Sequence, residues 1–287
     1  MIFEVLPVDC RRHFFCDGEH GQCTCVNGFK NSLTQSDFLN IMKWCYKAEE
    51  RQDMKYDNYI FDLYGTLIDI RTDEHDKETW KKWCHWLDEH GIKHPTYKVF
   101  RKDFWEREKQ ERDRAEAESQ FEVPEIDIIP VYRELFESYG NGILEDTLLE
   151  EASYAFRVAS RQYARLFRGV PEYLQLLRDN GKKVYLLSNA QATYTRPEIE
   201  MFHLDQYFDD MLLSSDYACM KPDKAYFDAL LDRYDMDRSK SVMHGDSASS
   251  DIAGANKAGI ASVHLDGDNS AKKYYRKELR RLGTPAQ

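Results

Sequence analysis

The amino-acid sequence predicts an α/β fold in which a doubly wound parallel sheet carries an inserted helical cap domain. Three observations support this prediction. From residue 59 onward, short apolar strands alternate with amphipathic helices, and polar or glycine-rich residues follow several of those strands. Residues 72–168, in contrast, show an almost entirely helical pattern. Alternating strands and helices are typical of a parallel sheet that is covered by helices on both faces.

The strands are expected where short apolar runs stop at polar or turn-forming residues. Five segments have this pattern: Tyr59–Phe61, Val184–Leu187, Met211–Leu213, Ser241–Met243 and Ala261–Leu265.

Two helices are predicted between these strands from the spacing of their apolar residues. Pro171–Arg178 is followed by Gly181, and glycine commonly ends a helix. The second helix, Ala225–Tyr234, places five large residues on one face: Tyr226, Phe227, Leu230, Leu231 and Tyr234.

The interval 72–168 is predicted to be the helical cap, inserted after the first strand. Trp80, Trp83 and Leu87 belong to one apolar stripe, and a second stripe runs from Leu148 to Leu166. Residues 101–118 are dense in charges of both signs, which predicts a long solvated helix. The α/β core is therefore expected to comprise residues 56–71 and 169–287.

Residues 1–55 are interpreted as a cysteine-rich N-terminal extension, because they hold five of the seven cysteines. Six side chains in this extension are candidate zinc ligands: Cys10, Cys16, Cys23, Cys25, His13 and His20. Their spacing does not give two Cys-x-x-Cys pairs, so reduced thiols in a small subdomain are favoured over a zinc site. A docking segment for a protein partner is a further interpretation of residues 1–55.

Composition and charge argue against several classes of function. The chain has 287 residues, of which 51 are acidic and 40 basic, and its net charge of −11 disfavours nucleic acid as the main partner. No apolar stretch approaches the roughly 18 residues of a membrane span. Glu4 and Asp9 interrupt the first apolar run, so a signal peptide is not expected. We therefore expect a cytoplasmic protein with free thiols, whose basic run 272–281 ends a solvated helix.

Four polar clusters fall where predicted strands end, and ligands of open parallel sheets bind at that edge. A carboxylate there is able to act as a nucleophile or metal ligand, and a lysine suits a phosphate group. A hydroxyl and an amide near a helix start are able to hold an anionic oxygen. Each cluster alone is also compatible with a turn or helix cap, but their order favours one site. The clusters are Asp62–Leu67, Ser188 with Asn189, Lys221–Asp223 and Gly245–Asp251.

These clusters resemble the four motifs of the haloacid dehalogenase-like hydrolase superfamily, over about three quarters of the chain. The insert resembles the first class of helical cap in that superfamily. The resemblance implies that Asp62 is a nucleophile that forms a covalent aspartyl intermediate. It also implies that Thr66 and Ser188 hold the oxygens of the transferring group, and that Lys221 steadies the nucleophile and the substrate anion.

The resemblance further implies a magnesium site. Asp246 and Asp251 match the acidic motif that completes a Mg²⁺ site with Asp62, and the backbone carbonyl of Tyr64 is expected as a further ligand. Hard oxygen ligands suit Mg²⁺. The implied chemistry, phosphoryl transfer, depends mainly on positioning and charge neutralisation.

Tyr64 departs from the phosphatase pattern. Phosphatases of this superfamily carry a second aspartate two residues after the nucleophile, where it acts as general acid and base. A phenol with a pKa near 10 is a poor base at neutral pH. Tyrosine at this position is the pattern of the 2-haloacid dehalogenases, whose halide leaves without a proton.

The fourth motif favours a phosphatase. Asp246 and Ala248 stand where dehalogenases have a serine and an asparagine, and no cap segment matches the one that holds their substrate. Two carboxylates facing Asp62 would repel it without a cation. We therefore expect Mg²⁺-dependent hydrolysis of a small phosphate ester through an aspartyl-phosphate at Asp62. A metal-free 2-haloacid dehalogenase is the enzymatic alternative, and a weakly active or inactive binding protein is the non-enzymatic one.

Overall fold

The computed structural model describes residues 14–16, 23–25 and 54–283. The chain divides into two units, residues 1–55 with 279–286 and residues 56–278 with 287. In the first unit, β1 (Phe14–Cys16) pairs antiparallel with β2 (Cys23–Cys25). Most of the N-terminal extension, including Cys10, His13 and His20, lies outside the described residues. The zinc, thiol and partner interpretations of the extension therefore stay predictions.

The second unit contains a five-stranded parallel sheet in the order β7-β6-β3-β8-β9. β3 (Asn58–Phe61) lies at its centre, between β6 (Lys183–Ser188) and β8 (Ser241–Gly245). β7 (Asp210–Leu213) and β9 (Ala261–His264) form the two edges. The predicted fold class is confirmed, and each of the five predicted strands is present with ends within two residues.

Helices cover both faces of this sheet because side chains alternate along β3. Ile60 shares a buried cluster with Phe227 of α9 (Lys224–Arg233). Phe61, which points to the other face, contacts the ring of Tyr173 on α6 (Val170–Asp179). The predicted helices 171–178 and 225–234 are thus α6 and α9, on opposite faces. The other helices near the sheet are α7 (Ala192–Met201), α8 (Ser214–Tyr217), α10 (Ala253–Ala258) and α11 (Ala271–Arg281).

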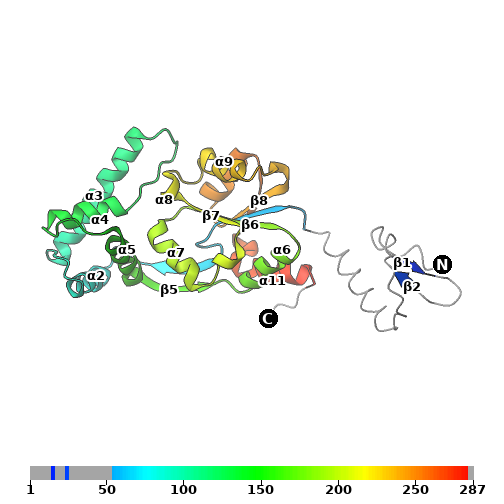
Figure 1. Cartoon of the computed structure of the whole chain (residues 1–287), viewed down its shortest axis with the longest axis horizontal. Coiled ribbons are helices and arrows are strands. Elements are labelled where there is room, and N and C mark those ends of the chain that lie inside the picture. The colour runs from blue at the N-terminus through cyan, green and yellow to red at the C-terminus, as the bar shows by residue number, and fades with distance from the viewer. Residues whose placement is uncertain (1–13, 17–22, 26–53, 284–287) are drawn as a thin grey trace. The chain divides into compact units, whose positions relative to one another are not determined.

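Four helices form a separate layer at one side of the sheet (Figure 1). They are α2 (Lys77–Glu89), α3 (Tyr97–Glu118), α4 (Ile129–Ser138) and α5 (Asp146–Ser160). They enclose their own aromatic core, in which Trp80, Trp83 and Phe156 are buried. The rings of Trp83 and Phe156 lie 5.0 Å apart, and Trp83 Nε1 donates to the carbonyl of Ala152 at 2.8 Å. This layer corresponds to the predicted cap.

One part of the cap prediction is wrong. Helical spacing predicts that the second apolar stripe continues as a helix to Leu166, but α5 ends at Ser160 and Arg161–Leu166 form the strand β5. β5 pairs antiparallel with β4 (Ile68–Thr72). Arg161–Leu166 contains residues that are compatible with a helix, so the ladder to β4, a tertiary interaction, overrides the local preference. The two strands connect the cap to the sheet (Figure 1).

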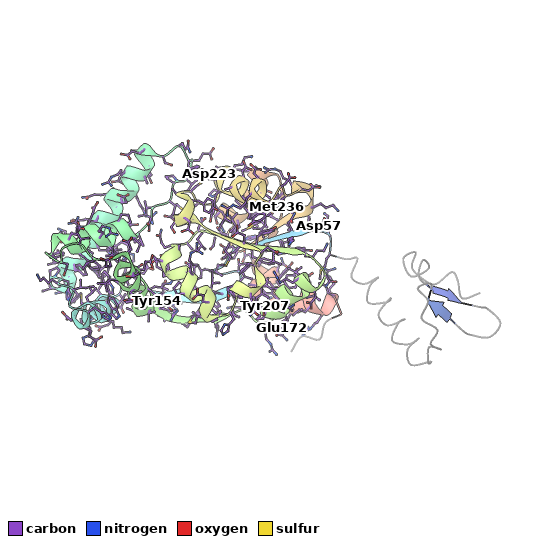
Figure 2. The ribbon with its side chains drawn as sticks, in the orientation of Figure 1. Asp57, Tyr154, Glu172, Tyr207, Asp223 and Met236 are labelled. Atoms are coloured by element: carbon purple, nitrogen blue, oxygen red, sulfur yellow. The ribbon has the colours of Figure 1, made fainter. Side chains whose placement is uncertain are left out.

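A third connection is the segment between α3 and α4, residues 119–128, here called the strap. The backbone amide of Met220 donates to the carbonyl of Val123 at 3.0 Å, and the backbone amide of Glu125 donates to the carbonyl of Ala218 at 3.1 Å. Asp223, labelled in Figure 2, accepts a hydrogen bond from the amide of Glu122 at 2.7 Å. The strap therefore lies against the loop that carries Lys221. No helix of the described residues is both long and apolar enough to cross a membrane.

Candidate active site

Three neighbouring strands place the predicted site residues at one edge of the sheet. Asp62 directly follows β3, Ser188 ends β6, and Asp246 follows β8. Because these strands are parallel and adjacent, their carboxyl ends meet at the same edge. The amide of Asp62 donates to the carbonyl of His244 at 2.9 Å, which continues the ladder to β8 up to the first site residue.

Asp62 is held by two of the predicted residues. Its Oδ1 accepts hydrogen bonds from Ser188 Oγ at 3.1 Å and from Lys221 Nζ at 2.7 Å. Lys221 Nζ also donates to the carbonyl of Leu187 at 2.7 Å and lies 2.7 Å from Asp251 Oδ1. The side chain of Lys221 is buried, so its ammonium group is fixed between two carboxylates.

Burial and charge compete in setting the pKa values of this pair. Burial raises the pKa of Asp62 to about 6, although the attraction of Lys221 opposes the rise. Burial alone would lower the pKa of Lys221, but Asp62 and Asp251 outweigh that effect, so its pKa lies above the usual range. Lys221 is therefore cationic, and Asp62 needs neighbouring positive charge to stay ionised near neutral pH.

Three carboxylates converge beside Lys221. One oxygen from each of Asp62, Asp246 and Asp251 lies within 4.8 Å of the others. Three carboxylates against one ammonium group leave a formal charge of −2 (−3 + 1). Burial and the proximity of Asp251 raise the pKa of Asp246. Close hard oxygen donors with excess negative charge fit a divalent cation such as Mg²⁺.

Two glycines allow these carboxylates to approach the backbone. A Cβ atom at Gly65 would lie 2.3 Å from Asp246 Oδ2, and one at Gly245 would lie 2.3 Å from Asp251 Cγ. Gly65 also has a φ of +81°, a conformation that L-residues rarely adopt. The glycines in the first and fourth motifs are therefore required by the packing of the acidic cluster.

Thr66 and Asn189 are engaged with other site residues. Thr66 Oγ1 is buried and donates to Asp246 Oδ1 at 3.3 Å. The side-chain amide of Asn189 makes two hydrogen bonds to the backbone of Lys221. Its Nδ2 donates to the Lys221 carbonyl at 2.9 Å, and its Oδ1 accepts from the Lys221 N–H at 2.8 Å. Asn189 thus positions the lysine loop. The substrate-binding roles of Thr66 and Asn189, and the metal role of the Tyr64 carbonyl, stay predictions.

Tyr64 belongs to a network that the sequence patterns do not identify. Its hydroxyl donates to Glu198 Oε2 at 2.6 Å and lies 3.2 Å from Thr195 Oγ1. Burial, and then the charge of Glu198, raise the pKa of Tyr64 far above its usual value. The guanidinium group of Arg157 lies 5.0 Å from the centre of the Tyr64 ring.

A sequence signal for this network exists in α5. The buried positions of this helix include Leu149, Ala152, Phe156 and Arg157, which recur at helical spacing. A charged residue within an apolar stripe indicates a buried partner of opposite charge. The stripe does not identify that partner, which is Glu198, 41 residues further along the chain.

Comparison with known proteins gives a family match and several relatives. A family model described as haloacid dehalogenase-like hydrolase matches residues 56–259. The pyrimidine 5'-nucleotidase YjjG of Escherichia coli (strain K12) is 32% identical over 133 residues, which are 46% of this chain and 57% of that protein. A phosphoglycolate phosphatase of Agrobacterium fabrum (strain C58 / ATCC 33970) is 26% identical over 204 residues, 71% of this chain and 78% of its own. The chain spans about half the length of the first curated relatives that it matches.

The crystal structure of a 2-haloacid dehalogenase from Pseudomonas syringae pv. Tomato DC3000 has the same fold. The two chains are 23% identical with a TM-score of 0.51, and the match covers 73% of this chain and 86% of the other.

Proposed function

The chain belongs to the haloacid dehalogenase-like hydrolase family, and from this premise we propose that it hydrolyses a small phosphate monoester with Mg²⁺ bound beside Asp62. The observation that carries the proposal is the group of three carboxylates around a single lysine. Without a cation, this site, with the nucleophile included, would hold a formal charge of −2 and would repel an anionic substrate. Relatives that are named as a nucleotidase and a phosphatase support the same reaction class.

Asp62, Asp246, Asp251 and the carbonyl of Tyr64 would hold the ion. When bound, Mg²⁺ supplies positive charge to the carboxylates and to the phosphoryl oxygens. The chain's own contribution to the same task is Lys221, whose ammonium group is already fixed 2.7 Å from both Asp62 and Asp251.

In the proposed reaction, a carboxylate oxygen of Asp62 attacks phosphorus while the bond from phosphorus to the ester oxygen breaks. Ser188 and Lys221 hold Asp62 Oδ1 and so restrict the carboxylate to one orientation for the attack. Water then hydrolyses the aspartyl-phosphate, which releases inorganic phosphate and restores the Asp62 carboxylate. The hydroxyl proton of Tyr64 is hydrogen-bonded to Glu198. The reaction is therefore expected to favour substrates whose leaving group departs without protonation, such as aryl or acyl phosphates.

One observation favours a second candidate function. Tyr64 occupies the position at which 2-haloacid dehalogenases carry a tyrosine, and carbon–halogen cleavage needs no proton for the leaving halide. In that reaction Asp62 would displace halide from a haloacid and form an ester, without metal. The charge of the carboxylate cluster is the argument against it.

A substrate panel separates the candidates. Phosphate esters and 2-haloacids are incubated with the full-length protein, with Mg²⁺ and with EDTA, and phosphate and halide release are measured. We expect phosphate release that depends on Mg²⁺. Halide release without phosphate release, unaffected by EDTA, would establish the dehalogenase instead, and no turnover on any substrate would favour a binding protein.

A further inference from the structure

Glu198 on α7 is a fully buried carboxylate with contacts from three other parts of the fold. Arg157 donates to it twice, from Nε to Oε1 at 3.0 Å and from Nη2 to Oε2 at 3.3 Å. Arg161 Nη1 donates to Oε1 at 3.3 Å. Tyr64 donates its hydroxyl to Oε2 at 2.6 Å. We call Glu198, Arg157, Arg161 and Tyr64 the Glu198 cluster.

The cluster joins the cap to the turn that carries the nucleophile. Arg157 lies in the last turn of the cap helix α5, one turn after Tyr154 (Figure 2), and Arg161 begins the connecting strand β5. Tyr64 lies two residues after Asp62. Arg157 is further enclosed by aromatic rings, because its guanidinium group lies 5.0 Å from the ring centres of both Tyr64 and Tyr194.

The interactions in this cluster depend on one another. The side chain of Arg157 is only 8% exposed and that of Glu198 0% exposed, so both charges depend on partners within the fold. Besides each other, Arg157 has Glu74 at 3.7 Å and Glu198 has Arg161 at 3.3 Å. Removing one member of a buried ion pair is strongly destabilising, because it leaves the other charge desolvated and unpaired. If the cap moved so that α5 separated from α7, the ion pair between Arg157 and Glu198 would break. The guanidinium group of Arg157 would also leave the Tyr64 ring.

We propose that Glu198 is a positioning residue that fixes the cap helix α5 and the Tyr64 side chain relative to Asp62. The part of this inference that concerns turnover rests on the proposed phosphatase function; the part that concerns the position of α5 does not. Two consequences follow. Glu198 holds the end of α5 in place through its ion pairs, and the Tyr64 hydroxyl proton is kept from the substrate because it is hydrogen-bonded to Glu198.

The test uses Glu198→Gln, which keeps the shape of the side chain and removes its charge. Hydrogen exchange of residues 153–161 is followed by mass spectrometry in the full-length protein, with Glu200→Gln, an exposed residue of the same helix, as the matched control. We expect exchange at the end of α5 to be at least about tenfold faster in Glu198→Gln and unchanged in Glu200→Gln. Unchanged exchange in Glu198→Gln would overturn the proposal, whether or not the protein has phosphatase activity.

Turnover provides a second readout that a purely structural role would not change. In Glu198→Gln, the Tyr64 hydroxyl is no longer held by a carboxylate. We therefore expect the ratio of kcat for alkyl phosphates to kcat for aryl phosphates to rise about threefold or more. The Mg²⁺ affinity, measured by calorimetry, should stay unchanged. An unchanged ratio alongside faster exchange would overturn the positioning of Tyr64. A wild-type protein without phosphatase activity would refute the proposed function, and the exchange experiment would still decide the role of Glu198.

If Glu198→Gln does not fold, two milder variants carry the test. Tyr64→Phe and Arg161→Gln each remove one donor to Glu198 and leave the Arg157 pair intact. Each is expected to accelerate exchange at the end of α5 about threefold. Exchange at the wild-type rate in both variants would overturn the proposal.

Discussion

At the nucleophile turn, the hydroxyl proton of Tyr64 is committed to Glu198, 2.6 Å away. A proton that already serves a buried carboxylate is a poor source for a departing alkoxide, and the raised pKa of Tyr64 has the same consequence. The residue that most distinguishes this site from a phosphatase site is thus used for internal structure.

Replacing Tyr64 by Asp is expected to restore leaving-group protonation. Hydrolysis of alkyl phosphates should accelerate more than that of aryl phosphates, because general acid–base assistance is typically worth about 10² to 10⁴ in rate and matters most for poor leaving groups. Steady-state rates on matched alkyl and aryl esters measure the difference. Equal acceleration of both, or complete loss of activity in Tyr64→Phe, would show that the tyrosine has an active chemical role. If the enzyme is a dehalogenase, Tyr64→Asp should create no phosphatase activity.

Removing a carboxylate from the acidic cluster is expected to abolish Mg²⁺ binding. Asp246→Ala lowers the formal charge of the site from −2 to −1 and removes one hard oxygen donor. Isothermal titration calorimetry should detect binding to the wild type and to Asp76→Ala, an exposed aspartate in the cap, but not to Asp246→Ala. Equal affinity in the wild type and Asp246→Ala, or turnover that EDTA does not affect, would contradict a magnesium site here.

Gly65→Ala tests the close approach of Asp246 to the backbone. The new Cβ atom would lie 2.3 Å from Asp246 Oδ2, so the carboxylate must move and Mg²⁺ affinity should fall at least tenfold. Gly91→Ala is the matched control, because Gly91 also has a positive φ (+69°) but nothing within 4 Å of the added atom. Both variants should lose about 1 kcal/mol of stability from backbone strain. Only Gly65→Ala should lose metal binding, as measured by calorimetry, and intact binding would show that the carboxylate adapts.

The cap depends on a core that is distinct from the sheet. Trp80, Trp83 and Phe104 are buried together with side chains from α4 and α5. Aromatic residues bury large areas and gain further stability from edge-to-face contacts. Because these four helices are packed through one cluster, the orientation of α5, and with it Arg157, depends on residues far from the active site.

Trp83→Ala is therefore expected to destabilise the cap by about 3–5 kcal/mol. The indole is 0% exposed, and its loss leaves a cavity and removes the hydrogen bond from Nε1 to the carbonyl of Ala152. Trp86→Ala, at a half-buried position of the same helix, should cost less than half as much. Urea unfolding followed by circular dichroism measures the free energies. A loss below about 1 kcal/mol for Trp83→Ala would mean that the aromatic cluster is not the main support of the cap.

Across the molecule as a whole, the packing of the sheet against its covering helices is expected to depend on pH through one buried histidine. His244 on β8 lies between Tyr59 and Phe61 on β3, with ring centres 5.8 and 4.8 Å away, and its Nε2 is 3.0 Å from the Tyr274 hydroxyl on α11. Burial lowers the pKa of His244 to about 3. The folded protein therefore keeps this imidazole neutral over the range in which an unfolded chain protonates it.

The contribution of His244 to the free energy of unfolding should fall as the pH drops below about 6.5. Between the unfolded pKa of about 6.5 and the folded pKa of about 3, the unfolded chain binds one more proton at His244, so this group alone lowers stability by about 1.4 kcal/mol for each pH unit. Below about pH 6 the raised pKa of Asp62 contributes with the opposite sign, because there the folded state binds the extra proton. Urea unfolding at pH 7, 6 and 5, in EDTA, measures this slope. His244→Phe should remove that part of the pH dependence. The same slope in the variant would assign the acid sensitivity to other groups.

Local sequence patterns determine the strands and the order of the site residues. Short apolar runs such as Tyr59–Phe61 are typical of strands buried within a parallel sheet. The carboxyl ends of parallel strands lie at one edge of the sheet. The convergence of Asp62, Ser188 and Asp246 is thus predictable from the sequence alone. Lys221 follows its strand less closely, because β7 ends at Leu213, so the strand end indicates its position only in outline.

The pairing of side chains across the chain depends on tertiary packing. Arg161–Leu166 become a strand because β4 offers a hydrogen-bonding partner, and Tyr64 contacts Glu198 across 134 positions of sequence. Helical periodicity identifies the face on which Arg157 or Glu198 lies, but it carries no information about what covers that face. The motifs are therefore readable from the sequence, whereas the cluster that ties the cap to the nucleophile turn arises from packing between segments that are distant along the chain.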